Sequence, residues 1–140
     1  MRASRAASAA AVAFQPVDST DFDPSFDLYG GGGLVSTVDD LARFYRALFT
    51  GRVLAKKATL RTMLGNPRPI WPADLGLGIF ALRLGTETCY GHQAIWGITV
   101  SHCPRTRVTI ASSINQATDV DNASLQLHAD MHRLATANAS

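Results

Sequence analysis

Apolar residues return at helical spacing in the segment that follows four consecutive glycines, residues 30–33. The stripe consists of Leu41, Phe44, Tyr45, Leu48 and Phe49. Ser36 or Thr37 can cap the first turn, and acidic side chains at positions 39 and 40 suit the positive end of a helix. Gly51 is typical of a helix end. The pattern predicts an amphipathic helix that begins after Thr37 and stops at Gly51.

A second, shorter helix is predicted from about Lys57 to Leu64, with Gly65 at its end. The sequence Asn-Pro-Arg-Pro at residues 66–69 follows at once, and its two prolines cannot continue a helix. We therefore expect the chain to turn there.

Short β-rich runs separated by turn-like residues begin at Leu75. They cover residues 75–84, 88–92, 97–103 and 107–115. Four such runs predict an antiparallel meander of about four strands.

The last segment, Val120 to Leu134, predicts an amphipathic helix that covers one face of this sheet. Its apolar positions are Val120, Leu127, Met131 and Leu134, with Ala123 and Ser124 beside them. His128 and His132 lie one helical turn apart, and we expect both to face solvent because no third metal ligand is near.

The order of these elements is loop, two helices, four strands and helix, which is typical of an α+β fold. Residues 14–28 contain two prolines and four aspartates without a sustained period, and predict an extended lead-in. The start of the chain, residues 1–13, is rich in alanine and favours a loosely helical segment over a cleaved export signal. We expect a poorly ordered or extended lead-in over residues 1–21, one domain over residues 22–136 and a tail over residues 137–140.

The composition is that of one globular domain, with 140 residues of which 46% are apolar and 17% charged. The net charge is +2 and the basic residues are scattered, which argues against nucleic acid as a partner. No apolar run approaches the roughly 20 residues of a membrane-spanning helix. Two cysteines are too few for a small protein held together by disulfides.

The sequence offers candidate metal ligands at Cys89, His92, His102 and Cys103. Because side chains alternate between the faces of a strand, Cys89 and His92 fall on opposite faces, and so do the adjacent His102 and Cys103. We therefore predict neither a metal site nor a cofactor. Cys89 and Cys103 lie opposite each other if the hairpin turns around Ile95 and Trp96, either as small buried residues or as a cross-strand disulfide.

The chain lacks the common motifs of a phosphate-binding loop or an activated serine. The glycine run has no Gly-Lys-Ser/Thr ending, and no Gly-x-Ser-x-Gly occurs. The two lysines, Lys56 and Lys57, follow Val53 and Leu54 by three residues, so the chain has no Ser-x-x-Lys. Ser36 is interpreted as a helix cap rather than a nucleophile.

Two blocks of sequence resemble the serine β-lactamase-like and penicillin-binding-protein-like hydrolases of the class C type. The first is Gly-Gly-Leu-Val-Ser-Thr-Val-Asp-Asp-Leu-Ala-Arg-Phe, at residues 32–44. The second is Tyr-Gly-His-Gln-Ala-Ile-Trp-Gly-Ile at residues 90–98, followed by Cys-Pro at 103–104 and Arg-Val-Thr-Ile-Ala-Ser-Ser-Ile-Asn-Gln at 107–116. The resemblance runs from about Phe22 to Leu134 and covers the C-terminal part of that family's catalytic domain.

The resemblance implies acyl transfer by a serine of a Ser-x-x-Lys motif, with a Tyr-based second motif and a Lys/His-Thr/Ser-Gly strand that binds substrate. His92 stands at the first position of the third motif, while Gln93 and Ala94 replace its hydroxyl residue and its glycine. The backbone N–H of Ile95 stands where the family's strand supplies an oxyanion donor. We predict substrate binding by His92, Gln93, Ala94 and Ile95, and name no catalytic residue. The alternative for His92 is a strand histidine without a chemical role.

The expectation is a truncated β-lactamase-related serine hydrolase that lacks the nucleophile half and is inactive alone. Tyr45-Arg46-Ala47 imitates the second motif but belongs to the apolar stripe of the first helix. The expected partner is a complementing N-terminal half. The alternative is a non-catalytic module that binds a protein or peptide by strand addition to an exposed sheet, unless Phe14, Phe22 and Phe26 fold back over it. A third possibility is a gene fragment without function.

Overall fold

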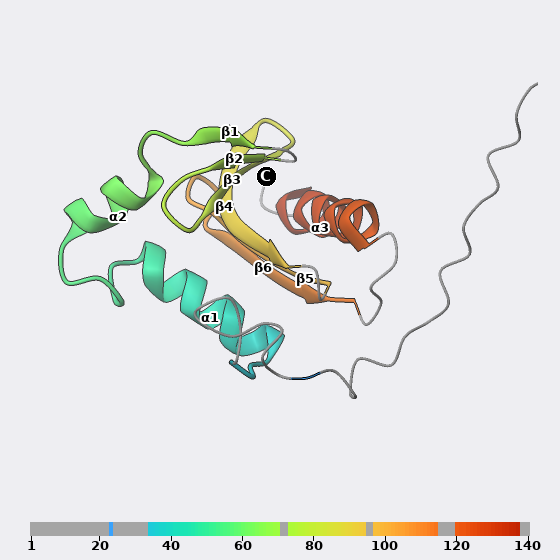
Figure 1. The fold of residues 1–140 in the computed structure, drawn as a ribbon. Helices are drawn as coiled ribbons and strands as arrows, with labels where there is room; N and C mark the ends of the chain where they lie inside the picture. Colours follow the sequence, from blue (N-terminus) through green and yellow to red (C-terminus); the bar gives the residue numbers. More distant parts are fainter. Residues whose placement is uncertain (1–22, 24–33, 71–72, 95–96, 115–119, 138–140) are drawn as a thin grey trace, which may run out of the picture. The chain divides into compact units, whose positions relative to one another are not determined.

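Three helices and six strands make up the part of the chain that the computed structural model describes (Figure 1). That part comprises residues 23, 34–70, 73–94, 97–114 and 120–137, with residues 120–122 described by their backbone alone. The helices are α1 (Val38–Phe49), α2 (Lys57–Leu64) and α3 (Val120–Ala137). The strands are β1 (Arg68–Ile70), β2 (Ala73–Leu75), β3 (Phe80–Leu84), β4 (Glu87–Ala94), β5 (Ile98–Cys103) and β6 (Val108–Ser113). The predicted α+β fold is confirmed, and all of these elements lie in one compact unit, Val35–Ser140.

Helix α1 begins at the predicted cap. The Thr37 hydroxyl accepts a hydrogen bond from the Asp40 backbone N–H at 3.1 Å, which satisfies one donor of the first turn. Tyr45 and Leu48 are buried against the sheet. Phe44 departs from the predicted stripe because 49% of it stays exposed. Gly51 follows the helix with a φ of +78°, a backbone conformation that favours glycine.

Helix α2 has the predicted bounds, but none of its side chains is fully buried. It is tied to the sheet through its backbone: the Leu77 N–H donates to the Met63 carbonyl at 2.9 Å. Gly76 lies so close that an added Cβ would be 2.6 Å from the same carbonyl oxygen. This glycine therefore allows the end of α2 to meet the β2–β3 connection.

The sheet is an antiparallel meander, as predicted, with the spatial order β1-β2-β3-β4-β5-β6. The predicted number of about four strands is too small. Strands β1 and β2 were missed because β1 contains Pro69, and an edge strand tolerates the missing N–H of proline. The predicted run over residues 75–84 contains only the last residue of β2, and β3 begins after a turn at Gly78, which has a φ of +71°.

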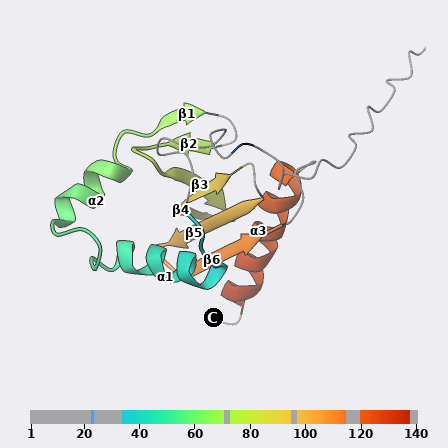
Figure 2. The same ribbon diagram turned by 60° about the horizontal axis from the view of Figure 1, so that its bottom comes forward.

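Helices α1 and α3 cover opposite faces of the sheet, as the two views in Figures 1 and 2 show. On the α1 face Tyr45, Ile79 and Val100 form an apolar core, and Phe49 stacks on Tyr90 beside it. On the α3 face Leu84 packs with Cys89 and Cys103. Neighbouring residues of one strand, such as Cys89 and Tyr90, thus lie on opposite faces of the sheet, as the two-residue period of a β-strand requires.

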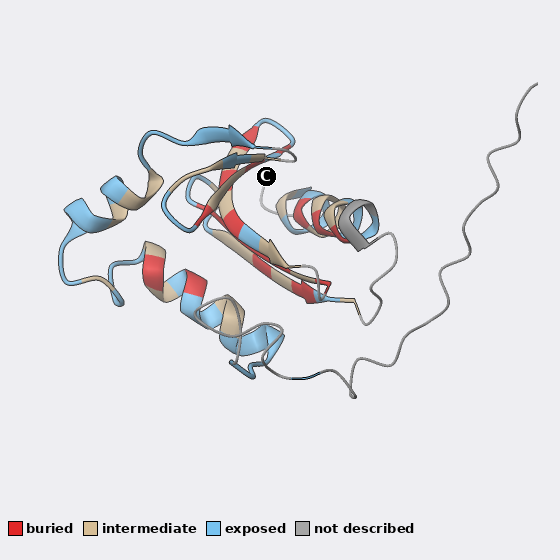
Figure 3. Cartoon of the chain, viewed as in Figure 1, coloured by how far each residue is buried: buried red, intermediate tan, exposed pale blue. Residues whose placement is uncertain are grey.

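The predicted apolar stripe of α3 is wrong. Leu127 and Leu134 are exposed, and the buried positions are Ser124, His128 and His132 (Figure 3). These three residues are spaced four apart and therefore share one side of the helix. The expectation that both histidines face solvent is likewise wrong, because the sheet beneath α3 carries polar partners for them.

Candidate functional site

The residues predicted to bind substrate lie at the end of β4. His92, Gln93 and Ala94 pair with Val100, Thr99 and Ile98 of β5. Ile95 lies outside the described residues. On the other side of β4, pairing with β3 stops at Gly91, which is opposite Phe80. Within the described part of the chain, residues 92–94 therefore have a neighbouring strand on one side only (Figure 1).

The pairing with β5 sets the direction of the Gln93 backbone. The Cα atoms of Cys89 and Cys103 are 4.2 Å apart, which is the close spacing of an antiparallel pair that does not exchange backbone hydrogen bonds. Such pairs alternate along the ladder, so the pair of Gln93 and Thr99 is of the same kind. The Gln93 N–H and C=O consequently point away from β5.

The side chains of His92 and Gln93 lie on opposite faces of β4. His92 is exposed and its ring lies beside that of Phe80, with 5.0 Å between ring centroids. The Gln93 Nε2 donates to the Ser124 hydroxyl of α3 at 3.1 Å. Ala94 follows the alternation and shares the face of His92. The structure thus brings His92 and Ala94 together and assigns the Gln93 side chain to the packing of α3.

The residue before this segment must be glycine. A Cβ on Gly91 would collide with the carbonyl oxygen of Val100, and with the Cα of Ser101 at 2.9 Å. Both contacts are with the backbone of β5, which cannot move away as the tip of a flexible side chain can. Gly91 therefore permits the approach of β4 and β5 immediately before His92.

The four metal ligands considered from the sequence are divided between the two faces. Cys89 and Cys103 lie opposite each other, as predicted, and form a disulfide on the α3 face. His102 points to the α1 face, where its ring stacks on Phe49 at 4.6 Å and its Nδ1 lies 2.7 Å from the Thr109 hydroxyl. Burial, followed by the charge of Arg46, lowers the pKa of His102. This histidine is therefore neutral near pH 7 and serves the packing of α1.

A serine and a histidine that the sequence analysis did not connect form a pair under α3. The Ser101 hydroxyl lies 2.7 Å from the His128 Nε2, and both residues are fully buried. Burial, followed by the charge of His132, lowers the pKa of His128 to about 4. A substrate cannot reach a serine that has no exposed surface, so this pair stabilises the fold rather than acting as a nucleophile and base. The spacing of Ser124, His128 and His132 was the signal that could have placed them on the buried side.

Two further features of the described residues are a hollow beside the sheet and the character of the helices. A hollow of about 580 Å³ lies on the α3 side of the sheet, between β2–β3 and α3, away from His92. Among the helices of the described residues, none combines the length and apolar character needed to cross a bilayer.

Comparison with known proteins identifies the family. A family model described as Beta-lactamase matches residues 2–133, which is nearly the whole chain. The match begins ahead of the resemblance seen from Phe22 onward and contains both sequence blocks. No curated protein and no solved structure gave a match. The chain therefore belongs to the β-lactamase family of serine hydrolases.

Proposed function

We propose that this chain supplies the substrate-binding strand of a β-lactamase-related acyl-transfer site, and that a partner segment carrying Ser-x-x-Lys supplies the nucleophile. The observation that carries the proposal is the open side of β4 at residues 92–94. A peptide-like substrate can lie along this side of β4 beyond Gly91, as an added strand does. Because none of the serines of the chain is followed three residues later by lysine, the chain is inactive by itself.

His92 has the position and exposure that a substrate-binding residue needs. Its imidazole lies on the face opposite the Gln93 side chain, next to the open side of the strand. A histidine there can donate a hydrogen bond to a carboxylate or carbonyl oxygen of the substrate. Ala94 carries a methyl group on the same face, where the family motif has glycine. This favours a substrate that does not need to approach the strand backbone as closely as a glycine would allow.

The alternative is a non-catalytic module that binds a protein or peptide. The observation that favours it is the position of β6, which ends the sheet and pairs only with β5 among the described strands. Every second residue of this six-residue strand turns its backbone groups away from β5, and such a strand is long enough to accept an added strand. In this alternative the partner binds along β6 and no acyl transfer takes place.

Hydrolysis assays test the proposal. The purified chain is assayed with a chromogenic cephalosporin and a p-nitrophenyl ester, alone and mixed with the separately expressed Ser-x-x-Lys segment of a class C type relative. We expect no turnover alone, turnover in the mixture, and a loss of at least about ten-fold in the mixture with His92→Ala, because a hydrogen bond to substrate is removed. Asp130→Asn, a change at the surface of α3, is the matched control and should leave turnover unchanged.

Two results would overturn the proposal. Turnover by the chain alone that His92→Ala abolishes would show that the chain carries its own nucleophile. Binding of the Ser-x-x-Lys segment without any turnover would favour the binding module instead. Amide chemical shifts distinguish the two surfaces, since a substrate analogue should perturb Gln93, whereas a strand added to β6 should perturb Thr109 and Ala111.

A further inference from the structure

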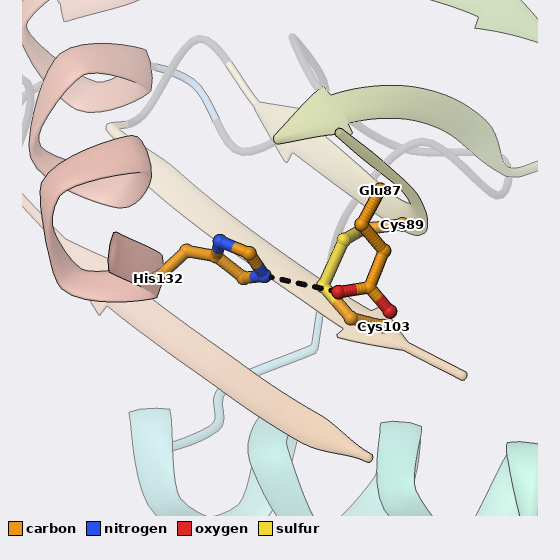
Figure 4. A group of neighbouring side chains, drawn as sticks. All are labelled: Glu87, Cys89, Cys103 and His132. Atoms are coloured by element: carbon orange, nitrogen blue, oxygen red, sulfur yellow. Dashed lines mark ion pairs between the residues drawn. A yellow bond between two sulfur atoms is a disulfide. The ribbon is translucent and has the colours of Figure 1, made fainter. Parts of the chain in front are cut away.

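A second group of reactive side chains lies on the α3 face of the sheet, opposite to that of His92. It consists of Glu87 and Cys89 of β4, Cys103 of β5 and His132 of α3, which we call the Glu87 cluster. Figure 4 shows the four side chains converging from two strands and a helix on one point. Their ligand atoms, two sulfurs, one imidazole nitrogen and one carboxylate oxygen, all lie within 4.8 Å of one another.

The Glu87 carboxylate is held in place as a buried anion. Only 3% of Glu87 is exposed. Its Oε1 accepts from the Thr106 backbone N–H and its Oε2 from the Thr106 hydroxyl, both at 3.0 Å. Burial alone raises the pKa of Glu87, but the two Thr106 hydrogen bonds and the charge of Arg105 outweigh it and lower the pKa below its ordinary value. The cluster therefore contains a buried carboxylate that Thr106 holds in one orientation.

The His132 imidazole points its Nε2 at this anion, at the distance of a long ion pair. The Nε2 lies 3.4 Å from the Glu87 Oε2 (Figure 4), and it is a buried nitrogen that lacks a hydrogen-bond partner among the described residues. A buried polar atom without a partner costs about 1–3 kcal/mol and calls for an explanation. A cation placed between the nitrogen and the carboxylate would satisfy both.

We propose that the Glu87 cluster binds one Zn²⁺ ion when the Cys89–Cys103 disulfide is reduced. A dithiol reductant breaks the S–S bond, is itself oxidised to a disulfide, and leaves two thiols on the chain. Zn²⁺ then displaces one proton from each thiol and takes the two thiolates, the His132 Nε2 and a Glu87 oxygen as its four ligands. The oxidised chain does not bind the ion, because its sulfurs are joined to each other.

The ligand set is that of a zinc site. Thiolate, imidazole and carboxylate are the three protein ligands of Zn²⁺, and four of them complete a tetrahedron without an open position. Zn–ligand bonds of about 2.0–2.3 Å separate neighbouring ligand atoms by about 3.5 Å. The atoms now spread over up to 4.8 Å would have to draw together, while the two sulfurs would have to move apart after reduction. Thr106 acts as the outer partner that orients the carboxylate.

Metal binding would change which elements are joined. The disulfide links only β4 and β5, which are already neighbours in the sheet. Zinc would also join the sheet to α3 through His132. The hollow of about 580 Å³ lies beside the cluster, since Leu84 and Ala129 line it and also pack against the two cysteines.

Spectroscopy with Co²⁺ as the probe tests the site in the full chain. Co²⁺ is added to the oxidised protein and to protein reduced by a dithiol that is then removed without oxygen. We expect one Co²⁺ per reduced chain, with the intense visible bands of a tetrahedral ion and a thiolate charge-transfer band, both lost when one equivalent of Zn²⁺ is added. The oxidised chain should show neither band.

Variants assign the ligands. We expect Glu87→Gln and His132→Ala each to weaken Co²⁺ binding by at least about ten-fold, the smallest effect of changing even a second-shell partner. The matched controls are Asp130→Asn for the carboxylate and His92→Ala for the imidazole, and both should bind as the unchanged protein does. The proposal is overturned if the folded, reduced protein, checked by circular dichroism, binds no Co²⁺. It is also overturned if both cluster variants bind as tightly as the controls, since the thiols alone would then hold the ion.

Discussion

Protonation of His128 should destabilise the fold as the pH falls, and the variant His128→Gln isolates this effect. The imidazole is fully buried, with its Nε2 against the Ser101 hydroxyl, and its pKa in the folded chain is lowered from 6.5 to about 4. The unfolded chain therefore binds a proton more readily than the folded one. The stability that the neutral imidazole contributes is complete above pH 6.5 and is lost as the pH falls towards 4.

The magnitude follows from the two pKa values. One pKa unit corresponds to about 1.4 kcal/mol, so the change from 6.5 to about 4 limits the loss to about 3 kcal/mol. Linkage then places about 2 kcal/mol of that loss at pH 5 and nearly all of it at pH 4. Glutamine removes the titrating group while it keeps a side chain able to hydrogen-bond to Ser101.

The assay is urea unfolding of the oxidised chain and of His128→Gln at several pH values between about 7 and 4. The difference between their free energies of unfolding cancels the contributions of the carboxylates and of His102, whose pKa is also lowered by burial. We expect the unchanged protein to lose about 2 kcal/mol relative to the variant by pH 5. Parallel pH profiles, or an ordinary His128 pKa measured by NMR, would refute the reasoning.

Three further substitutions test the fold by the same unfolding assay. Leu48→Ala should lower the free energy of unfolding by about 2–5 kcal/mol because it empties a buried position of α1. The half-exposed Phe44 should tolerate alanine far better. Equal losses would mean that the helix packs on another side. Gly91→Ala should lower the free energy of unfolding by about 1–3 kcal/mol because its methyl group meets the β5 backbone. An unchanged urea midpoint would disprove that contact. Thr37→Ala should cost about 1 kcal/mol through the lost cap, with Ser36→Ala as the neutral control, and the reverse order would identify Ser36 as the cap.

The elements that could be predicted from the sequence are those that local signals determine. The Thr37 cap and the apolar spacing after it define α1, and Gly65 with the prolines beyond it defines the end of α2. The opposition of Cys89 and Cys103 also follows locally, because it depends only on the length of one hairpin. In each case the residues that decide the structure lie within a few positions of one another or on adjacent strands.

Periodicity could not predict which side of α3 is buried, because this depends on the surface of the sheet that faces the helix. Leu127 and Leu134 suggest an apolar stripe, yet the sheet beneath the helix presents Gln93, Ser101 and Glu87, which select the polar side of α3 instead. Likewise, β1 forms only because β2 is there to pair with it. Such choices rest on contacts between distant segments, which outweigh local preference.

The candidate site remains a prediction from the sequence, and the structure adds its geometry. The order of the two motif blocks pointed to His92, Gln93 and Ala94, and the alternation of a strand already implied that His92 and Gln93 diverge. The point at which β3 stops pairing with β4 could not be foreseen, because it depends on β3 beginning at Phe80, opposite Gly91. The register of two strands, rather than any motif, decides it.

The polar contacts between α3 and the sheet determine where the helix can sit along it. From one end to the other, Ser124 meets Gln93, His128 meets Ser101 and His132 faces Glu87, so each turn of the helix has a different partner. Sliding the helix by one turn would exchange these partners and leave buried groups facing the wrong chemistry, at a cost that a sliding apolar surface would not incur. We expect α3 to dock in a single register, and the geometry of the Glu87 cluster to be reproduced each time the chain folds.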